Sequence, residues 1–332
     1  MKSTPVLRSR SKRLMLVAAC SLALPFAAPL HAQTAWPTKQ VRMIVPFAPG
    51  GSTDVVARML AQRLSDKWGQ TVVVENRSGA GGNIGSDVVA KAQGDGYTLL
   101  MASGSITINP HLYAKMPFDT EKDLVPISNI ASGPMLVVVQ DKSPIKSMKD
   151  LIATAKAKPG ALSFGSAGVG SQVHLAAENF ADAAGIDIQH VPYKGEAPAY
   201  TDLIGGQTQL MVGNIAVAAS LLGPDRLRAL AVTGKERSKL LPDVPTVAES
   251  GLPGFENTGW FGLYAPAGTP PEVIAKVQRD SAEVLRNTEI KARLFVLGMV
   301  PVGNTPAQLD KQMDTESVRW AQVVKNRNLK TK

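Results

Sequence analysis

A length of 332 residues is enough for two ordinary domains with hydrophobic cores. The formal charge of +9 comes largely from residues 1–32, which hold five basic residues and no acidic one, so the remainder has 36 − 5 = 31 basic against 27 acidic residues, or +4. The basic residues are scattered and form no stripe with aromatic residues, so we expect no nucleic-acid partner.

Residues 1–32 have the composition of a secretory signal peptide. A basic head precedes the apolar stretch Leu14–Leu24, which is too short to span a membrane, and Leu30-His31-Ala32 resembles a cleavage site. We expect cleavage after Ala32 and export to the periplasm. Cleavage before Cys20, as in a lipoprotein, would leave an apolar core of roughly six residues, below the ~7–15 expected, so we expect no lipid anchor.

Without Cys20, the mature chain has no cysteine, which excludes a disulfide, a thiolate nucleophile and a thiol metal site. The sequence also contains no His-Glu-x-x-His motif, so we expect neither a metal nor another cofactor.

The rest of the chain alternates short apolar runs with helical patterns. Near-continuous apolar runs are typical of strands buried on both faces of a parallel sheet. The predicted strands are Val41–Val45, Val72–Glu75, Leu99–Ala102, Leu136–Val139, Leu162–Phe164, Ile188–Val191, Leu210–Val212 and Leu227–Val232. Single apolar stripes predict helices from Val56 and from Val173, and Thr305-Pro306 is typical of the start of a final helix reaching about Lys325.

This order of elements predicts an α/β fold with two mostly parallel sheets. Two halves each begin with glycine-rich turns, and the extended stretches Ile127–Val139 and Glu256–Ala265 can cross between them. We therefore expect one domain from residues 33–136 plus 259–332 and a second from 137–258, joined by a hinge with a cleft between them.

The turn between the first strand and first helix is rich in glycine and hydroxyl residues. Such a turn aims unpaired backbone N–H groups and the positive end of a helix dipole at one point, which favours an anion. The candidate ligand-binding residues here are Phe47, Gly50, Gly51, Ser52, Thr53 and Asp54. A tight turn is the alternative, in which Ser52 or Thr53 caps the helix and Asp54 fixes the loop or caps the helix.

Similar turns follow other predicted strands. We interpret the glycines between Arg77 and Gly85 mainly as structural, because Ile84 stands where a dinucleotide fingerprint needs its third glycine. The other turns can bind an anion, although each hydroxyl can instead cap a helix. Their candidate ligand-binding residues are Ser103, Ser105, Thr107, Ser166, Ala167, Gly168, Gly170, Ser171, Tyr193, Lys194, Gly195 and Asn214.

Most of these turns lack a catalytic partner, so the pattern indicates a protein that holds an anion without transforming it. We expect no catalytic residues. The alternative is a secreted α/β hydrolase that acts on a small ester. Ser166 with a distant histidine would be its best constellation, but no Gly-x-Ser-x-Gly elbow surrounds it because position 164 is Phe.

Spaced motifs along the mature chain resemble those of a known family. They include Val45–Gly51 with Asp54, Val74–Arg77, Asp95–Leu100, Gly165–Gly168, Val191–Gly195, Leu241–Thr246 and Trp260–Pro266. In this order they resemble the extracytoplasmic solute receptors of tripartite tricarboxylate transporters, called Bug-type periplasmic binding proteins. The resemblance covers nearly all of the mature chain.

The resemblance implies a type II periplasmic-binding-protein fold, a small mono-, di- or tricarboxylate in the cleft, and delivery to a membrane permease. It also implies that the loops around residues 47–54, 103–107, 166–171 and 193–195 line the cleft. We expect a monomer. Many members of the family carry an acid where this chain has Gly213, and its absence disfavours an amino-acid ligand.

Overall fold

The computed structural model describes residues 1–4 and 36–331. The predicted cleavage site and Cys20 lie outside the described residues. The chain divides into two units, Met1–Trp36 and Pro37–Lys332, and the second contains all the helices and strands discussed below. No helix among the described residues is long and apolar enough to cross a membrane.

The first three strands form one parallel layer, as their apolar sequences predict. The strand β1 (Val41–Val45) lies between β2 (Val72–Asn76) and β3 (Thr98–Ser103). The helices of this part are α1 (Ser52–Trp68), the one-turn η1 (Ala80–Gly82), α2 (Asn83–Ala90), α3 (Ser105–Leu112) and α4 (Thr120–Asp123).

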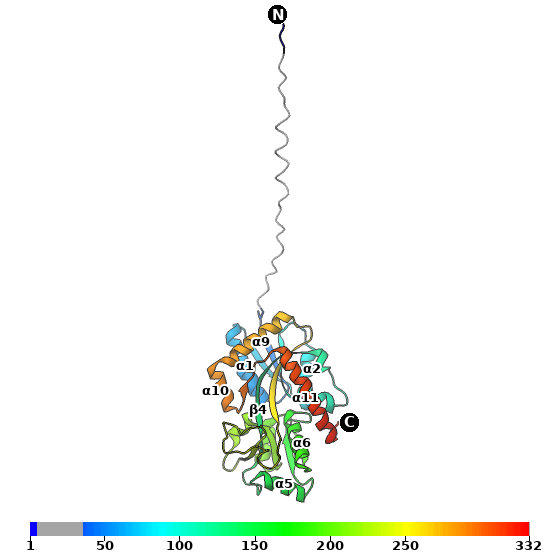
Figure 1. The fold of residues 1–332 in the computed structure, drawn as a ribbon, viewed down its shortest axis with the longest axis vertical. Helices are drawn as coiled ribbons and strands as arrows, with labels where there is room; N and C mark the ends of the chain where they lie inside the picture. Colours follow the sequence, from blue (N-terminus) through cyan, green and yellow to red (C-terminus); the bar gives the residue numbers. More distant parts are fainter. Residues whose placement is uncertain (5–35, 332) are drawn as a thin grey trace. The chain divides into compact units, whose positions relative to one another are not determined.

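Two strands carry the chain across the molecule. The 17-residue strand β4 (Leu124–Gln140) pairs antiparallel with β9 (Thr258–Pro266) until Pro134 lies opposite Thr258. From Met135 onward, β4 instead pairs antiparallel with β7 (Leu210–Asn214) and β8 (Leu227–Val232). These strands occupy the stretches predicted as crossovers, and Figure 1 shows β4 running through the middle of the folded unit.

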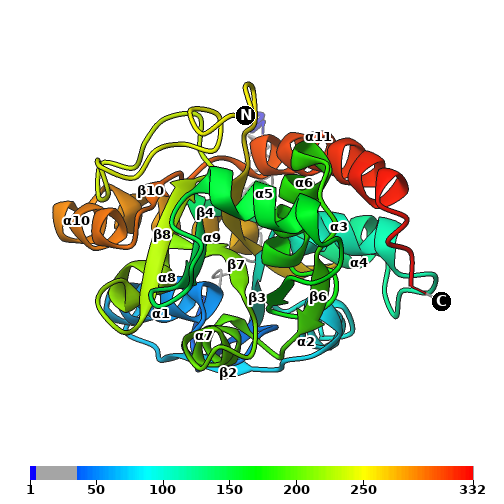
Figure 2. The same ribbon diagram turned by 90° about the horizontal axis from the view of Figure 1, so that it is seen from below.

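The last part of β4 belongs to a second sheet, in which β5 (Ser163–Ser166) pairs parallel with β6 (Gln189–Pro192) and β7. Its helices are α5 (Met148–Ala157), α6 (Gln172–Ala184), α7 (Glu196–Ile204), α8 (Ile215–Ala218) and η2 (Ala219–Leu221). Figure 2 shows α6 and α7 on opposite sides of β7. The sheets are therefore parallel at their flanks and antiparallel where the crossover strands pair.

The C-terminal part of the chain returns to the first sheet. It contains α9 (Pro271–Arg286), α10 (Thr288–Val296), β10 (Val300–Pro301) and α11 (Pro306–Asn326). The predicted final helix is confirmed, with a capping box between Thr305 and Gln308. One apolar cluster joins α3, α6 and α11 through Leu112, Leu175 and Trp320.

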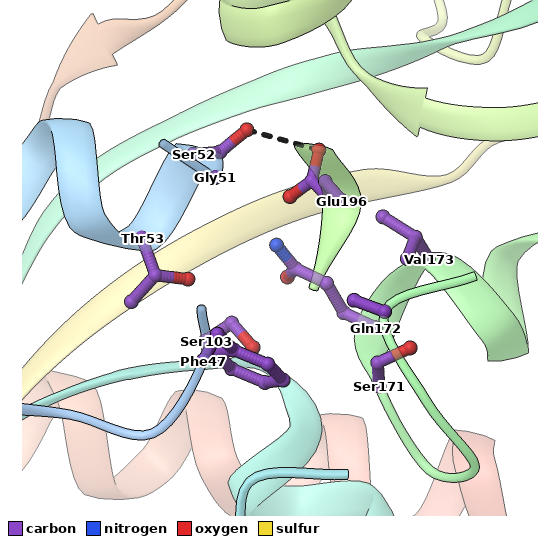
Figure 3. Close-up of a pocket in the computed structure, with 10 residues that line it drawn as sticks. Phe47, Gly51, Ser52, Thr53, Ser103, Ser171, Gln172, Val173 and Glu196 are labelled. Atoms are coloured by element: carbon purple, nitrogen blue, oxygen red, sulfur yellow. Dashed lines mark hydrogen bonds between the residues drawn. The ribbon is translucent and has the colours of Figure 1, made fainter. Parts of the chain in front are cut away.

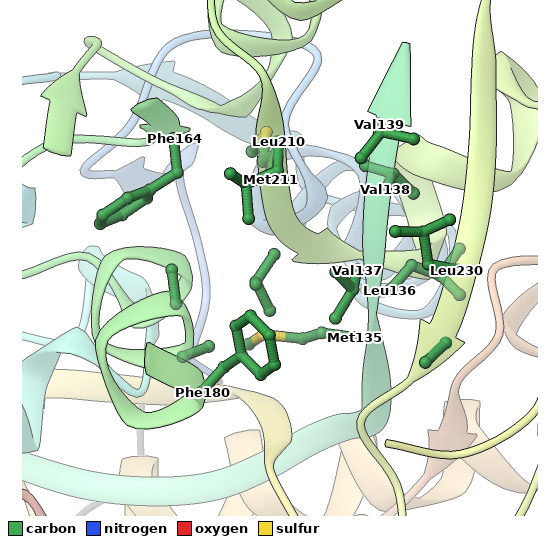
Figure 4. Packing of buried hydrophobic residues seen from close by; sticks show 14 of the residues in the cluster. Met135, Leu136, Val137, Val138, Val139, Phe164, Phe180, Leu210, Met211 and Leu230 are labelled. Atoms are coloured by element: carbon green, nitrogen blue, oxygen red, sulfur yellow. The ribbon is translucent and has the colours of Figure 1, made fainter. Parts of the chain in front are cut away.

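The two sheets have separate hydrophobic cores, as expected for a two-domain α/β fold. Figure 4 shows the core of the second sheet, where Phe180 from α6 packs toward Met135 and Val137 of β4. We call the elements around the first sheet, with α9 to α11, lobe 1, and the elements from α5 to β8, lobe 2. The strands β4 and β9 run between them.

Candidate functional site

Four described helices begin around one small cavity between the lobes. This inner cavity measures about 10 Å³, which is roughly the space that one water molecule needs. Figure 3 shows its lining residues, which come from the starts of α1, α6 and α7, from the end of β3, and from the turns after β1 and β5. They are Phe47, Gly51, Ser52, Thr53, Ser103, Ala167, Ser171, Gln172, Val173 and Glu196.

The start of α1 presents two hydroxyl groups to this cavity. The residue before the helix is Gly51, with an extended backbone and no side-chain cap, so the predicted capping by Ser52 or Thr53 is wrong. Both hydroxyls are instead at the cavity wall. Phe47 also lines the cavity, and its ring packs into the core cluster of lobe 2.

Asp54 fixes the loop, as one of the alternatives for it predicts. Its carboxylate accepts hydrogen bonds from the Gly50 amide, the Arg58 guanidinium and the Asn76 side chain. Burial alone would raise the pKa of Asp54, but these three donors hold the pKa below its ordinary value. Neither Gly50 nor Asp54 is among the lining residues of the inner cavity.

The loop before α3 contributes one hydroxyl to the cavity wall. Ser103 lines the cavity, and its Oγ is 3.1 Å from Oγ of Ser105. The Thr107 hydroxyl donates to the Gly104 carbonyl oxygen and so belongs to the local turn. Thr107 lines a different surface pocket, on the side of α11, so of the three predicted hydroxyl residues here only Ser103 lines the inner cavity.

The start of α6 combines a helix cap with a cavity wall. Ser171 is the N-cap, and its Oγ accepts the His174 amide at 3.3 Å. Because this bond uses only a lone pair of Oγ, the O–H group of Ser171 remains able to donate to a ligand. Gly168 and Gly170 adopt positive φ angles of 112° and 82°, which the tight turn before the helix requires.

Ser166 lies behind this wall. Its side chain is fully buried, and its Oγ is 2.6 Å from Nε2 of His190. Burial lowers the pKa of His190 to about 4, and the ring stacks against His174 and Phe164. His174 is thus a packed histidine, and burial together with His190 holds its pKa well below the ordinary value.

Gln172 connects the two lobes inside the cavity. Its Oε1 atom accepts the backbone amide of Gly104 in lobe 1, at 3.2 Å, and that of Trp260 in β9, at 3.3 Å. Its Nε2 atom is 3.4 Å from Oδ1 of Asn214 in lobe 2. The side chain of Gln172 is therefore a polar bridge between α6 and lobe 1.

Glu196 makes the second connection. Its Oε2 accepts the Ser52 hydroxyl of lobe 1 at 3.1 Å, and its Oε1 accepts the Asn214 amide at 2.8 Å. Burial raises the pKa of Glu196 to about 7, although the hydrogen bonds from Asn214 and Ser52 act in the opposite direction. Asn214 is thus behind Glu196 and is not itself a lining residue.

An outer pocket of about 650 Å³ lies beside the inner cavity, with Ala167 in both walls. Lobe 2 contributes Gly168, Tyr193 and Lys194 to it, and lobe 1 contributes the Gly79–Gly81 turn. The Tyr193 hydroxyl donates to Asp202 at 2.7 Å. The glycine turn that we interpreted mainly as structural therefore also faces this pocket.

The lobes meet closely at this outer pocket. The Ala48 amide donates to the Lys194 carbonyl oxygen at 3.1 Å, and a Cβ on Gly195 would lie only 2.9 Å from Cβ of Ala48. A Cβ on Gly81 would lie 1.9 Å from the Val169 carbonyl oxygen. Glycine at positions 81 and 195 therefore permits this approach of the lobes.

Comparison with known proteins identifies the family. Residues 56–329 match the model of the tripartite tricarboxylate transporter family receptor. The chain belongs to this family. It is similar to Protein BugT of Bordetella pertussis, with 42% identity over 308 residues, covering 92% of this chain and 94% of BugT.

Two solved structures are also similar to this receptor. The structure of R. palustris Rpa4515 with adipate has a TM-score of 0.86 and 38% identity, covering 88% of this chain and 98% of that one. The structure of MatC from Rhodopseudomonas palustris with bound malate has a TM-score of 0.82 and 31% identity, covering 87% and 99%. These likenesses extend over both lobes of the receptor.

The predicted ligand-binding residues of the receptor thus fall into three groups. Those at the inner cavity are Phe47, Gly51, Ser52, Thr53, Ser103, Ala167 and Ser171. Those at the outer pocket are Ala167, Gly168, Tyr193 and Lys194. Those that line neither are Gly50, Asp54, Ser105, Thr107, Ser166, Gly170, Gly195 and Asn214.

Sequence reasoning missed three lining residues of the inner cavity, Gln172, Val173 and Glu196. Each lies within two residues after a predicted site residue, at the first or second position of a helix. Their place at a helix start beside a candidate turn was the signal that could have found them. No cluster of residues suited to hold a metal ion occurs among the described residues.

We predict that Glu196 makes the stability of the receptor depend on pH. Because its folded-state pKa of about 7 exceeds its ordinary value of 4.5, its contribution to stability is complete below pH 4.5 and is lost as pH rises through 7. As pH rises from 4.5 to 8, the free energy of unfolding of Glu196→Gln should therefore increase relative to that of the wild type by up to roughly 3 kcal/mol.

Urea unfolding of both proteins across this pH range measures the effect. The exposed Glu236→Gln variant controls for the loss of one negative charge. A constant difference in unfolding free energy between Glu196→Gln and wild type would show that folding does not raise the pKa of Glu196 and would contradict the prediction.

Proposed function

We propose that this receptor captures a small organic carboxylate in the cleft between its lobes and delivers it to the membrane permease of a tripartite tricarboxylate transporter. The observation that carries the proposal is the convergence of helix starts and hydroxyl groups on one cavity. Backbone N–H groups at helix starts favour anions, and the hydroxyls of Thr53, Ser103 and Ser171 can donate to carboxylate oxygens.

The ligands of similar proteins support the carboxylate class. Rpa4515 was solved with adipate and MatC with malate, and both structures match nearly the whole mature chain. Receptors of this family work in the periplasm. We propose the same location for this chain, with residues 1–32 removed as a signal peptide and the mature receptor acting as a monomer.

Ligand entry requires the lobes to separate, because a cavity of about 10 Å³ admits no organic acid. We propose that residues 33–136 plus 259–332 move as one domain and residues 137–258 as the other. The strands β4 and β9 connect them, and β4 changes partners next to Pro134. Closing on the ligand would then present a surface that the permease can distinguish from the open form.

Within this cleft, we propose that the lining residues of the inner cavity contact the ligand and that Tyr193, Lys194 and Gly168 border its entrance. The remaining predicted residues support the loops: Asp54 holds the Gly50 amide, and Asn214 holds the carboxylate of Glu196. The function is capture without chemical change, so we propose that the receptor has no enzymatic activity.

We predict that organic acids stabilise the receptor. A ligand at ~100 times its dissociation constant adds about 2.7 kcal/mol to the free energy of unfolding, because it binds only the folded state. A thermal-shift screen of mono-, di- and tricarboxylates against neutral sugars and cations measures this. Stabilisation by sugars or cations, with none by any carboxylate, would contradict the proposal.

We predict that Ser171→Ala weakens binding of an acid found in this screen by roughly 1.5–3 kcal/mol, the range for hydrogen bonds to charged groups. The matched control is Ser147→Ala, because Ser147 also caps a helix, accepting the Asp150 amide at 3.1 Å, but lies away from the cavity. Both variants should lose similar stability, and only Ser171→Ala should lose affinity in calorimetric titration. If Ser171→Ala binds the acid as tightly as the wild type does, Ser171 serves only as a helix cap.

The hydrogen bond between Ser166 and His190 keeps one alternative open, a secreted α/β hydrolase acting on a small ester. Three observations weigh against it: Ser166 is fully buried, it is not at the cavity wall, and the low pKa of His190, about 4, makes it a weak base. We therefore predict no turnover of generic nitrophenyl esters. Turnover that Ser166→Ala abolishes would establish the hydrolase instead.

A further inference from the structure

A surface groove of about 880 Å³ lies on lobe 1 and shares no lining residue with the inner cavity or the outer pocket. Its walls come from α3, α4 with the loop before it, α11 and the start of β4. Figure 2 shows the three helices close together. We call this hollow the acidic groove, because of the charge on its rim.

The floor of the acidic groove is apolar. Ile106, Phe118 and Met313 line it and also belong to the hydrophobic core cluster of lobe 1. Met116 lines it as well and packs against the same cluster. The floor is therefore held in place by the core beneath it. An apolar hollow of this size at the surface is typical of a binding site.

The rim of the acidic groove carries charge of one sign. Asp119 and Glu121 lie at the start of α4, and no described lysine or arginine lines the groove. Asp310 and Asp314 lie about one turn apart on α11. Lys122 pairs with Asp119 at 2.7 Å, but the other three acids form no ion pair with a described residue. This concentration of carboxylates contrasts with the net charge of +4 expected for the mature chain.

The arrangement of these acids fits an extended partner better than a single small cation. They are not gathered into a group that suits a metal ion, because the described residues contain no such group. Asp310 and Asp314 are ~6 Å apart along the axis of α11, and the other acids lie on a different helix. Several separate charges around an apolar floor complement a polypeptide segment that has basic side chains around an apolar one.

Thr120 adds an independent observation. It lines the acidic groove and is only 8% exposed, and its hydroxyl has no hydrogen-bond partner among the described residues. A buried hydroxyl without a partner is costly, so the folded chain alone leaves this wall incomplete. A polypeptide backbone in the groove can supply the missing partner, because it carries both donors and acceptors.

We propose that the acidic groove docks a basic polypeptide segment of a partner protein. An apolar side chain of that segment covers the groove floor, and its lysines or arginines pair with Glu121, Asp310 and Asp314. The inference goes beyond the proposed function, because it requires no ligand in the cleft. All the lining elements belong to lobe 1 or to the adjoining start of β4, so docking does not depend on closure of the lobes.

Fluorescence anisotropy with short labelled peptides tests the inference. The main probe combines lysine and leucine. One comparison peptide replaces its leucines by serines at the same charge, and another replaces its lysines by glutamates. The receptors are the wild type, Asp310→Asn/Asp314→Asn, and the control Glu236→Gln/Asp243→Asn. The control removes the same charge from exposed acids that lie outside the groove and form no ion pair with a described residue.

The wild type should bind the lysine–leucine peptide more tightly than either comparison peptide, with an affinity that falls as salt concentration rises. Asp310→Asn/Asp314→Asn should weaken this binding by roughly two- to thirtyfold, the range for two exposed ion pairs, and the control should bind as the wild type does. No peptide binding, equal binding of the serine peptide, or equal weakening in both double variants overturns the inference. Complete displacement of the peptide by an equal concentration of spermidine would indicate a small-cation site and would also overturn it.

Discussion

The polar contacts that join the two lobes inside the cleft are the interaction on which the rest of the site depends. Gln172 accepts the backbone amides of Gly104 in lobe 1 and of Trp260 in β9, and Glu196 accepts the Ser52 hydroxyl of lobe 1. All these groups are buried, where a satisfied polar network fixes one arrangement and an unsatisfied one is costly. The proposed opening of the lobes would break these bonds and return their groups to water.

This balance explains how a receptor without a cationic inner cavity can hold an anion. In the proposed site, backbone amides and hydroxyls at helix starts would bind a carboxylate without the strong, fixed charge of an arginine. Moderate binding suits a protein that must also release its ligand. Closure would add affinity because the ligand then contacts both lobes in a cavity from which water is excluded.

Outside the cavity, the ion pair of Arg327 with Glu178 and the apolar cluster of α11 with α6 also join the lobes. The helix α11 therefore acts as a third connection beside β4 and β9. The proposed hinge motion of the lobes would have to accommodate all three connections.

The sequence predicted much of this architecture because the relevant signals are local. The bounds of β1, the capping box at Thr305 and the glycine turn before α6 follow from patterns within a few residues. Which side chains of a turn reach the cavity depends on tertiary packing instead. Asp54 turns to Arg58 and Thr107 bonds to the Gly104 carbonyl, so neither predicted site residue lines the inner cavity, although both lie in the first turn of a helix that begins there.

Glu196 and Gln172 are lining residues that the sequence did not predict, for the same reason. A glutamate at the first position of a helix, or a glutamine after a serine cap, is an ordinary residue for that position. Their roles depend on partners far away in the sequence, such as Ser52 and Trp260. Only the three-dimensional arrangement of the lobes reveals them as parts of the site.

Small-angle X-ray scattering of the purified receptor, with and without a saturating carboxylate, tests the central claim most directly. The claim is that ligand binding shifts the lobes toward the closed arrangement seen here, which requires tighter binding to the closed form than to the open one. The account predicts a smaller radius of gyration with ligand. It also predicts no such decrease in Gly81→Val, whose side chain would collide with the Val169 carbonyl on closing. A scattering profile of the wild type that is unchanged at saturation would contradict it.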